Sequence, residues 1–263
     1  MKKLFALLLV LVMALGLFAA CGTTEPAGTT APKTDDPAGT TAPAEETLPE
    51  GVMTHAEYEA AAMDSQVTVH TYVQAVESWW DGKVQIYAQS KDGAYYIYNL
   101  ACTEEEAAKL VPGTKLEVSG YKGEWSGEIE IMDATYKILE GSWKVESAAD
   151  VTALMGTDEL AKHMNELVAV KGLTVAASKD ANGNDVPFLY KWDGSGSQGD
   201  DIYFNVTLGD ATYTFTVNAY MIGIEDTYKA VEALKIGDKI DVEGFLYWYN
   251  GAQPHVTAVA PAK

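Results

Sequence analysis

The residues that most often hold metals are few in this sequence and are not spaced for that purpose. The four histidines are His55, His70, His163 and His255, and no two of them stand four positions apart on one helix. The sequence has two cysteines and neither lies in a pair near a histidine. Because zinc sites need three or four such ligands at short spacings, we expect no zinc centre.

Covalent catalysis is not indicated either. The sequence contains no Gly-x-Ser-x-Gly segment, and residues 194–199 (GSGSQG) are typical of a flexible loop. The sequence also lacks a glycine-rich loop followed by lysine, the motif that binds phosphate in many nucleotide-binding proteins. Carboxylates are abundant because the whole chain is acidic, so their presence alone marks no acid–base pair. We therefore expect no catalytic residue and no enzymatic activity; an exported hydrolase would need a pocket with converging carboxylates.

One segment has the oxygen-rich spacing of a calcium loop. Asp180, Asn182 and Asn184 place oxygen-bearing side chains at alternate positions, and Asp185 follows them. An EF-hand loop requires glycine where Asp185 stands and a bidentate glutamate at its end, which this segment lacks. An Asn-Gly turn in a long polar loop is the favoured interpretation. Calcium is the alternative, and no other cofactor is expected.

Charge argues against two classes of partner. The 18 basic residues are all lysine, against 38 acidic residues, which gives a formal net charge of −20. Nucleic-acid-binding proteins collect lysine and arginine on one face, and polybasic segments bind anionic membrane surfaces. Neither pattern is present, so nucleic acid is an unlikely partner.

Aromatic residues make up 10% of the chain, enough to build a substantial core.

The first twenty residues have the organisation of an export signal. Lys2 and Lys3 precede an apolar run that ends on Ala19 and Ala20, and such a run is too short for a lasting transmembrane helix. The quartet Phe18-Ala19-Ala20-Cys21 resembles the lipobox of bacterial lipoproteins, although that family usually has leucine where Phe18 stands. The resemblance implies a signal peptide at 1–20, lipidation of Cys21 and anchoring to the outer face of the bacterial cell membrane. Plain secretion is the alternative.

A linker follows the predicted anchor. Residues 21–51 contain five of the nine prolines and repeat the phrase PAGTTAP. With almost no large apolar residue, this stretch cannot bury a core, and we expect it to be disordered.

The rest of the chain contains an internal repeat. Residues 110–127 (LVPGTKLEVSGYKGEWSG) align without a gap with residues 234–251 (LKIGDKIDVEGFLYWYNG). Each copy follows a short helical pattern, at 103–109 and 226–233, and the first of these begins with a capping box at Thr103 and Glu106. A short helix is also expected to lead into each copy, from Thr54 and from Thr157.

Period-two alternation predicts three strands before each of those helices and two after it. The first strands begin near Val67 and Val168, and hairpins follow at 83–99 and 202–218. Three strands, a helix and two strands is the order of the OB-fold, a five-stranded Greek-key barrel, and the phrase Gly-x-Lys-[Leu/Ile]-x-Val-x-Gly resembles the fourth strand of many OB domains. We expect a mainly β protein with two tandem five-stranded OB-fold-like barrels at 52–142 and 143–263. A small β-sandwich is the alternative.

Aromatic residues gather at the loops that border the ligand face of an OB-fold. That face spans strands two and three and is bounded by the loop after strand one and the loop between strands four and five. We expect three tryptophans to share the rim of the first copy and five aromatics to border the second. These candidate ligand-binding residues are Trp79, Trp80, Trp125, Tyr190, Trp192, Tyr247, Trp248 and Tyr249.

These features predict a surface-anchored lipoprotein that acts as a non-enzymatic binding or adaptor module. Its expected partner is a glycan or another surface protein, contacted through the rim aromatics. The alternative is a structural or assembly protein of the cell envelope, in which the aromatics form protein–protein interfaces. Binding of single-stranded nucleic acid is the least favoured, because stacking on aromatics needs an electropositive groove beside them.

Overall fold

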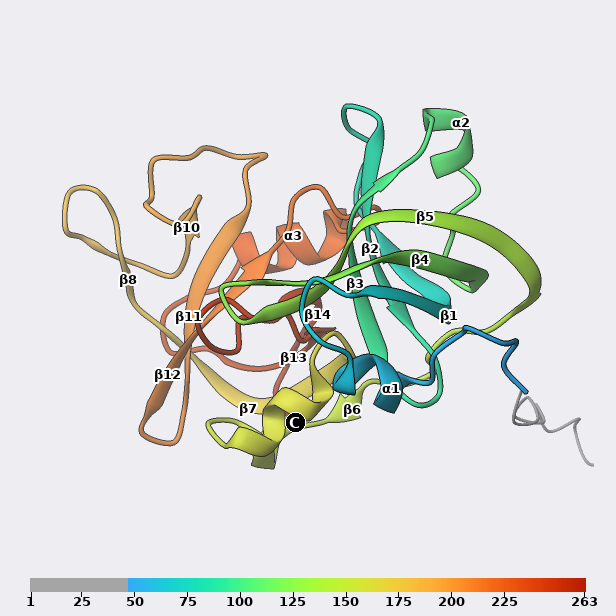
Figure 1. Ribbon diagram of the computed structural model, residues 1–263. Coiled ribbons are helices and arrows are strands. Elements are labelled where there is room, and N and C mark those ends of the chain that lie inside the picture. Colours follow the sequence, from blue (N-terminus) through green and yellow to red (C-terminus); the bar gives the residue numbers. More distant parts are fainter. Residues whose placement is uncertain (1–46) are drawn as a thin grey trace, which may run out of the picture. The chain divides into compact units, whose positions relative to one another are not determined.

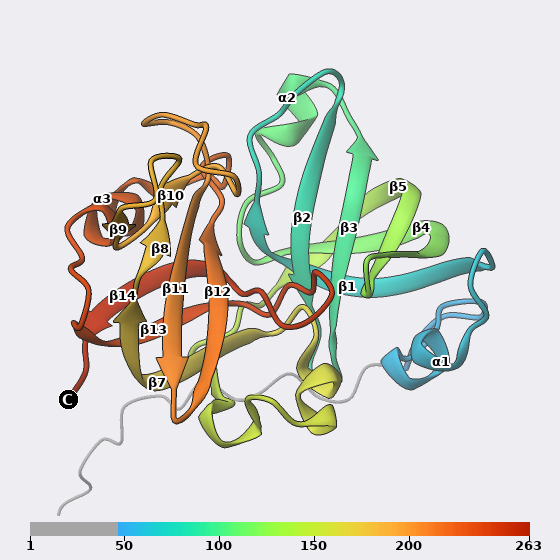
Figure 2. The same cartoon turned by 90° about the vertical axis from the view of Figure 1, so that its left-hand side faces the viewer.

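Alternating apolar side chains build two closed five-stranded barrels (Figures 1 and 2). The structure is a computed structural model in which residues 47–263 are described. Cys21, the predicted signal peptide and most of the predicted linker lie outside the described residues. No helix within 47–263 has the length and apolar character needed to cross a membrane.

The first barrel follows the predicted order. Its strands are β1 (Gln66–Val76), β2 (Lys83–Gln89), β3 (Ala94–Ala101), β4 (Thr114–Trp125) and β5 (Glu128–Ser142). They pair in the closed order β1-β2-β3-β5-β4, in which β1 is antiparallel to both β2 and β4, and β3 is parallel to β5. Helix α2 (Glu104–Ala107) lies between β3 and β4, and the capping box of Thr103 and Glu106 is formed.

The second barrel repeats this topology. Strands β11, β12, β14, β13 and β7 pair in that order, and pairing of β7 with β11 closes the ring. The strands span β7 (Leu167–Ala176), β11 (Ile202–Leu208), β12 (Ala211–Val217), β13 (Lys239–Phe245) and β14 (His255–Pro261). Helix α3 (Glu225–Glu232) stands between β12 and β13, as α2 does in the first barrel. The OB-fold-like prediction is therefore confirmed and the sandwich is excluded.

Smaller elements complete the chain. Helix α1 (His55–Ala60) leads into the first barrel and begins with the predicted capping box of Thr54 and Glu57. The helix expected from Thr157 is a 3-10 helix, without a hydrogen bond from the Thr157 side chain to cap it. The remaining short elements are β6 (Ala149–Asp150), η1 (Thr152–Leu154), η2 (Asp158–His163), β8 (Ser178–Lys179), β9 (Asp185–Val186) and β10 (Leu189–Tyr190).

A buried lysine fixes α1 to the first barrel. Lys122 on β4 is only 4% exposed, and its Nζ donates hydrogen bonds to the carbonyl oxygens of Tyr58, Glu59 and Ala61 at 2.7–3.0 Å. These carbonyls lie at the end of α1, where backbone acceptors lose their helical partners. The ammonium group therefore satisfies the end of the helix and places it against β4.

The second barrel covers the outer face of β2 and β3. Tyr87 and Tyr96 point outward from these strands and belong to the apolar cluster of the second barrel. The Tyr87 ring stacks on Phe245 with 4.5 Å between ring centroids, and its hydroxyl forms a 2.8 Å hydrogen bond with Nδ1 of His255. The face that would bind a ligand in an OB-fold is thus an internal interface in the first barrel.

Three carboxylic acids are buried at the edge of this interface. Glu128, fully buried on β5, accepts a 2.7 Å hydrogen bond from the backbone N–H of Trp248, and Glu77 accepts one of 2.8 Å from the Asn218 side chain. Burial raises the pKa of Glu128 to about 8 and that of Glu77 to about 7. The pKa of Glu130 is raised to about 7 by the same cause. The Oε1 atom of Glu128 has no hydrogen-bond partner, so ionisation there is poorly compensated.

Replacing Lys122 by methionine should lower the free energy of unfolding by about 2–4 kcal/mol, because three carbonyl oxygens lose a charged donor. Urea denaturation monitored by tryptophan fluorescence measures this change. The matched control is Lys137→Met, which removes an exposed ion pair with Glu117 and should cost under about 1 kcal/mol. Equal costs for the two variants would contradict the structural role of Lys122.

Glu128→Gln should make stability less dependent on pH. The raised pKa means that the folded protein keeps a proton that the unfolded chain releases above pH 4.5, so ionisation removes stability as pH rises toward 8. Between pH 4.5 and 8, the pH dependence of the free energy of unfolding should be smaller in the glutamine variant than in the parent, by up to about 1.4 kcal/mol per pH unit. Urea denaturation at a series of pH values tests it, with Glu124→Gln at an exposed position as control. An unchanged slope in Glu128→Gln would refute the assignment.

Candidate functional site: an aromatic cleft on the second barrel

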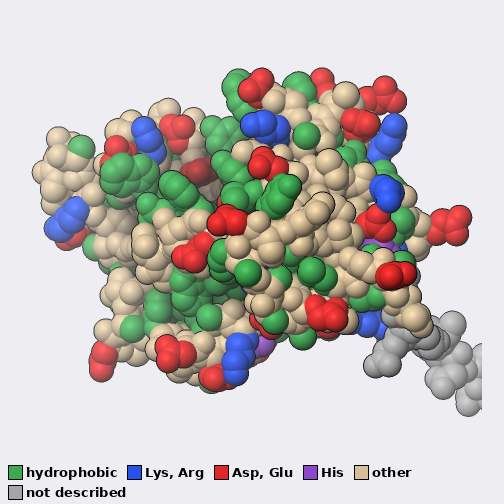
Figure 3. All heavy atoms as spheres, viewed as in Figure 1, with side chains coloured by type: hydrophobic (Ala, Val, Ile, Leu, Met, Phe, Trp, Pro, Cys, Tyr) green, Lys and Arg blue, Asp and Glu red, His purple; other side chains and the backbone are tan. Residues whose placement is uncertain are grey.

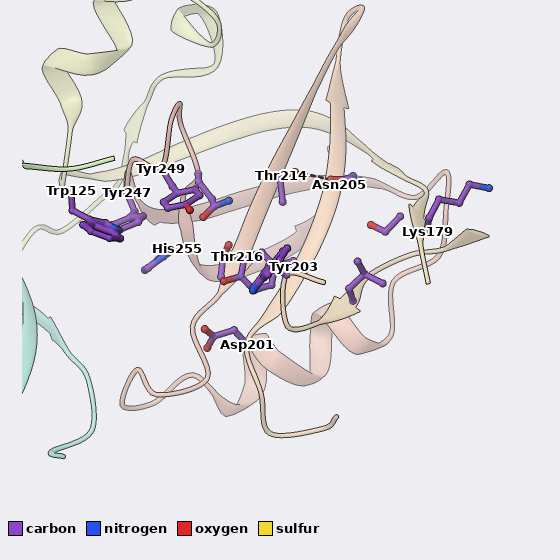
Figure 4. A pocket seen from close by; sticks show the side chains of 14 residues that line it. Trp125, Lys179, Asp201, Tyr203, Asn205, Thr214, Thr216, Tyr247, Tyr249 and His255 are labelled. Carbon is purple, nitrogen blue, oxygen red and sulfur yellow. Dashed lines mark hydrogen bonds between the residues drawn. The ribbon is translucent and has the colours of Figure 1, made fainter. Parts of the chain in front are cut away.

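The corresponding face of the second barrel is open and hollowed. A cleft of about 670 Å³ lies over β11 and β12 (Figure 4). It is bounded by the loop between β7 and β11 on one side and by the loop between β13 and β14 on the other. This is the position at which OB-folds hold their ligands.

The floor of the cleft consists of outward-facing side chains of the β11–β12 hairpin. Tyr203 pairs with Thr216 and Asn205 pairs with Thr214 across the two strands, and all four line the cleft. Their sequence neighbours Phe204 and Phe215 point into the barrel and are fully buried, because successive side chains of a strand face opposite sides. The Thr214 hydroxyl donates a 2.8 Å hydrogen bond to Oδ1 of Asn205, which orients the amide.

Aromatic side chains form the walls. Trp192 comes from the β7–β11 loop, and Tyr247 and Tyr249 come from the β13–β14 loop. Trp125 is supplied by the first barrel, at the end of β4, and in Figure 4 it lies with Tyr247 at one end of the cleft. Trp192 is 70% exposed, Trp125 61% and Tyr249 49%. These rings therefore present free faces on which a ligand could stack.

The charged groups of the cleft are Lys179 and Asp201, and His255 is held neutral. Burial lowers the pKa of His255 to about 3, and the imidazole stacks on Tyr247 with 4.4 Å between centroids. Asp201 accepts a 2.8 Å hydrogen bond from the backbone N–H of Ala219. Its carboxylate is thus partly engaged in holding the backbone. The remaining polar lining is uncharged: Ser178, Asn205, Thr214, Thr216 and Gln253.

One hydroxyl in the floor lacks a partner. Thr216 is 2% exposed, and its Oγ1 makes no hydrogen bond. A buried hydroxyl without a partner costs free energy. Thr216 lines the cleft, but its Oγ1 atom is itself buried beneath the surface of the floor.

The structure distributes the predicted ligand-binding residues over several places. Trp125, Trp192, Tyr247 and Tyr249 line the cleft, whereas Trp79, Trp80, Tyr190 and Trp248 are not among its lining residues. The Tyr190 hydroxyl donates a 2.6 Å hydrogen bond to Glu232 of α3. Trp248 packs against Gly127, where a Cβ atom would come within 2.7 Å of its ring.

Trp79 and Trp80 lie in the loop between β1 and β2. The indole N–H of Trp79 donates a 2.9 Å hydrogen bond to the carbonyl oxygen of Cys102. Trp80 is 80% exposed. The expectation that both would share a rim with Trp125 thus finds no counterpart in this cleft, because Trp125 lies against the loop of the second barrel.

The oxygen-rich segment forms a turn between β8 and β9. Both carboxylate oxygens of Asp180 accept hydrogen bonds, from the backbone N–H groups of Asn182 and Asn184 and from the Asn184 amide. Asp185 forms a 2.7 Å ion pair with Lys179. Within residues 47–263, no group of three or more histidine, cysteine, aspartate or glutamate side chains is arranged to hold a metal ion.

The floor of the cleft is not among the residues predicted from the sequence. The floor residues occupy the outward positions of strands whose inward positions are apolar; they are Tyr203, Asn205, Thr214 and Thr216. The signal that could have found them is the unusual set of neutral polar residues on both strands of the second hairpin, where the first hairpin carries Tyr87 and Tyr96.

Comparison with known proteins gives no family. No protein-family model matches the sequence, and no curated protein matches it. Among solved structures, a murine DNA-binding protein bound to double-stranded DNA is 11% identical, with 74% of this chain and 98% of that chain covered and a TM-score of 0.32.

Two further structures are similar to the same limited degree. Asparaginyl-tRNA synthetase of Entamoeba histolytica is 14% identical with a TM-score of 0.30; the match covers 36% of this chain, which spans about a quarter (24%) of the synthetase chain. A replication protein A heterotrimer bound to single-stranded DNA is 10% identical with a TM-score of 0.29, over 76% of this chain and 52% of that chain.

Thr216→Val should leave the fold as stable as the parent or stabilise it by up to about 1 kcal/mol, because an unpartnered hydroxyl is replaced by a methyl group of similar size. Thermal and urea denaturation measure this effect. Thr71→Val in the first barrel is the matched control, since its hydroxyl is also buried without a partner. A loss of more than about 1 kcal/mol in Thr216→Val alone would show that this hydroxyl has a structural role.

Proposed function

We propose that this chain is a non-enzymatic binding module whose second barrel holds an uncharged, hydroxyl-rich ligand, such as a glycan, in the aromatic cleft. The observation that carries the proposal is the combination of exposed aromatic faces with neutral hydrogen-bonding side chains. Sugar rings offer apolar C–H faces for stacking and hydroxyl groups for donors and acceptors, and the neutral polar side chains of the lining supply partners for such groups.

Charge in and around the cleft supports a neutral ligand. Lys179 is the lysine among its lining residues, and it is paired with Asp185. A groove that binds single-stranded nucleic acid combines stacking with several cations along the backbone. The face drawn in Figure 3 carries scattered acidic side chains and few lysines, consistent with the net charge of −20. Nucleic acid is therefore the least favoured ligand.

The proposed location follows from the sequence. The lipobox-like quartet ending in Cys21 supports an exported lipoprotein, and the proline-rich linker would hold the barrels away from the membrane. An acidic surface suits this placement, because it keeps an exported domain soluble and repelled by anionic lipid.

A second candidate is an assembly protein of the cell envelope. The observation that favours it is an apolar area at the junction of the barrels, where Trp80 is 80%, Ile222 67% and Tyr220 57% exposed. Hydrogen bonds of Ser78 with the Tyr220 carbonyl, at 2.7 and 3.0 Å, hold the two segments together. Exposed aromatic residues of this kind are enriched in protein–protein interfaces.

A glycan array and cell-wall pull-down test the two candidates. Trp192→Ala and Tyr249→Ala should each weaken glycan binding at least about fivefold, since stacking contributes ~1 kcal/mol or more per ring. Trp125→Ala should weaken it as well, because this side chain reaches the cleft from the first barrel. Trp80→Ala is the matched control, an exposed tryptophan outside the cleft, and should bind as the parent does.

Two results would contradict the cleft as the binding site. If Trp80→Ala lost glycan binding and Trp192→Ala kept it, the binding site would lie on the first barrel. Assembly would be favoured if the protein bound no glycan and its mass in light scattering rose with protein concentration. In that case Trp80→Ala should reduce the rise in mass.

A further inference from the structure

A second hollow adjoins the aromatic cleft. It has a volume of about 600 Å³ and shares three lining residues with the cleft: Thr214, Tyr249 and Gln253. Its far wall is formed by residues 156–161, in and before η2, which precede the second barrel. The two hollows therefore meet along the β13–β14 loop rather than lying on separate faces.

The chemistry of the second hollow matches that of the cleft. Trp248, Tyr213 and Tyr249 contribute aromatic surface, and Thr157, Thr212 and Asn250 contribute neutral polar groups. Asp158 is the charged residue among its lining side chains. A ligand that suits one hollow thus finds the same kinds of contact in the other.

The loop between the hollows is fixed rather than free. The backbone N–H of Asn250 donates a 2.6 Å hydrogen bond to the carbonyl of Ser126 in the first barrel, and that of Gln253 donates one of 2.9 Å to Tyr247. Tyr249 is half-exposed on this loop and lines both hollows. It is placed to contact a ligand that passes from one to the other.

We propose that the cleft and the second hollow form one groove that binds a glycan chain of several sugar units, with Tyr249 contacting the chain at the middle. This inference rests on the proposed function and adds a second subsite to it. Small-molecule sites usually measure about 300–1,000 Å³, a range that the two hollows together exceed. A single sugar would fill only part of the groove.

The test is the dependence of affinity on ligand length. Calorimetry with β-1,4-linked N-acetylglucosamine oligomers and cello-oligosaccharides, each from one to six units, supplies the probes. The parent protein should bind the longest oligomer of the recognised series at least about tenfold more tightly than its disaccharide, a gain equivalent to about 1.4 kcal/mol.

Thr212→Arg removes the second subsite alone. Thr212 is exposed and lines only the second hollow, so the long side chain should abolish the gain with length while leaving disaccharide affinity unchanged. Ala211→Arg is the matched control: it is exposed, adjacent and absent from both linings, and it should keep the gain.

The outcomes separate this inference from the proposed function. Equal affinity for short and long oligomers in the parent protein overturns the groove and leaves the cleft as a single-sugar site. A gain that persists in Thr212→Arg overturns the assignment of the second subsite. Failure of both oligomer series to bind, at any length, overturns the groove and counts against the glycan cleft as well.

Discussion

The structure depends on the packing of Tyr87 from the first barrel against Phe245 and His255 of the second. The Tyr87 ring stacks on Phe245, and its hydroxyl forms a hydrogen bond with the imidazole of His255. One side chain therefore joins the two barrels by both an apolar and a polar contact. This contact covers the β2–β3 face. It also brings the tip of the β4–β5 hairpin to the β13–β14 loop, where Gly127 packs beneath Trp248. Trp125 reaches the cleft for that reason.

Two copies of one topology have thereby acquired different surfaces. The outward residues of β2 and β3 include Tyr87 and Tyr96, which are large enough to fill an interface. Those of β11 and β12 include Asn205 and Thr214, which are small or polar and leave a hollow above the sheet. Since the inward residues of both hairpins are apolar, the barrels fold alike. The outward positions of the two hairpins therefore help to distinguish the covered face of the first barrel from the open cleft of the second.

The internal repeat and period-two alternation were sufficient to predict the strand order, because each strand needs apolar residues on one face and each helix needs its cap. The capping boxes at Thr54 and Thr103 depend on neighbours three residues apart and were equally visible. The sequence did not show that Trp125 and Trp192 line the same cleft, because this depends on how the two barrels pack on each other. The residues next to Trp125 and Trp192 in the sequence do not indicate that packing. Trp79 and Trp80 also lie in a predicted loop, so the sequence did not distinguish them from the tryptophans of the cleft.

The interface also joins groups whose titrations oppose one another. His255 has its pKa lowered to about 3 from an ordinary value of 6.5, so the unfolded chain takes up a proton before the folded one does and stability falls as pH drops below 6.5. Glu77 and Glu128 have raised pKa values, so their contribution falls as pH rises above 4.5. Between these two values the single histidine offsets only part of the slope, because two glutamates act against it. Taken alone, these three groups favour the folded state most in mildly acidic solution. One of them, His255, also lines the cleft, to which the first barrel contributes Trp125.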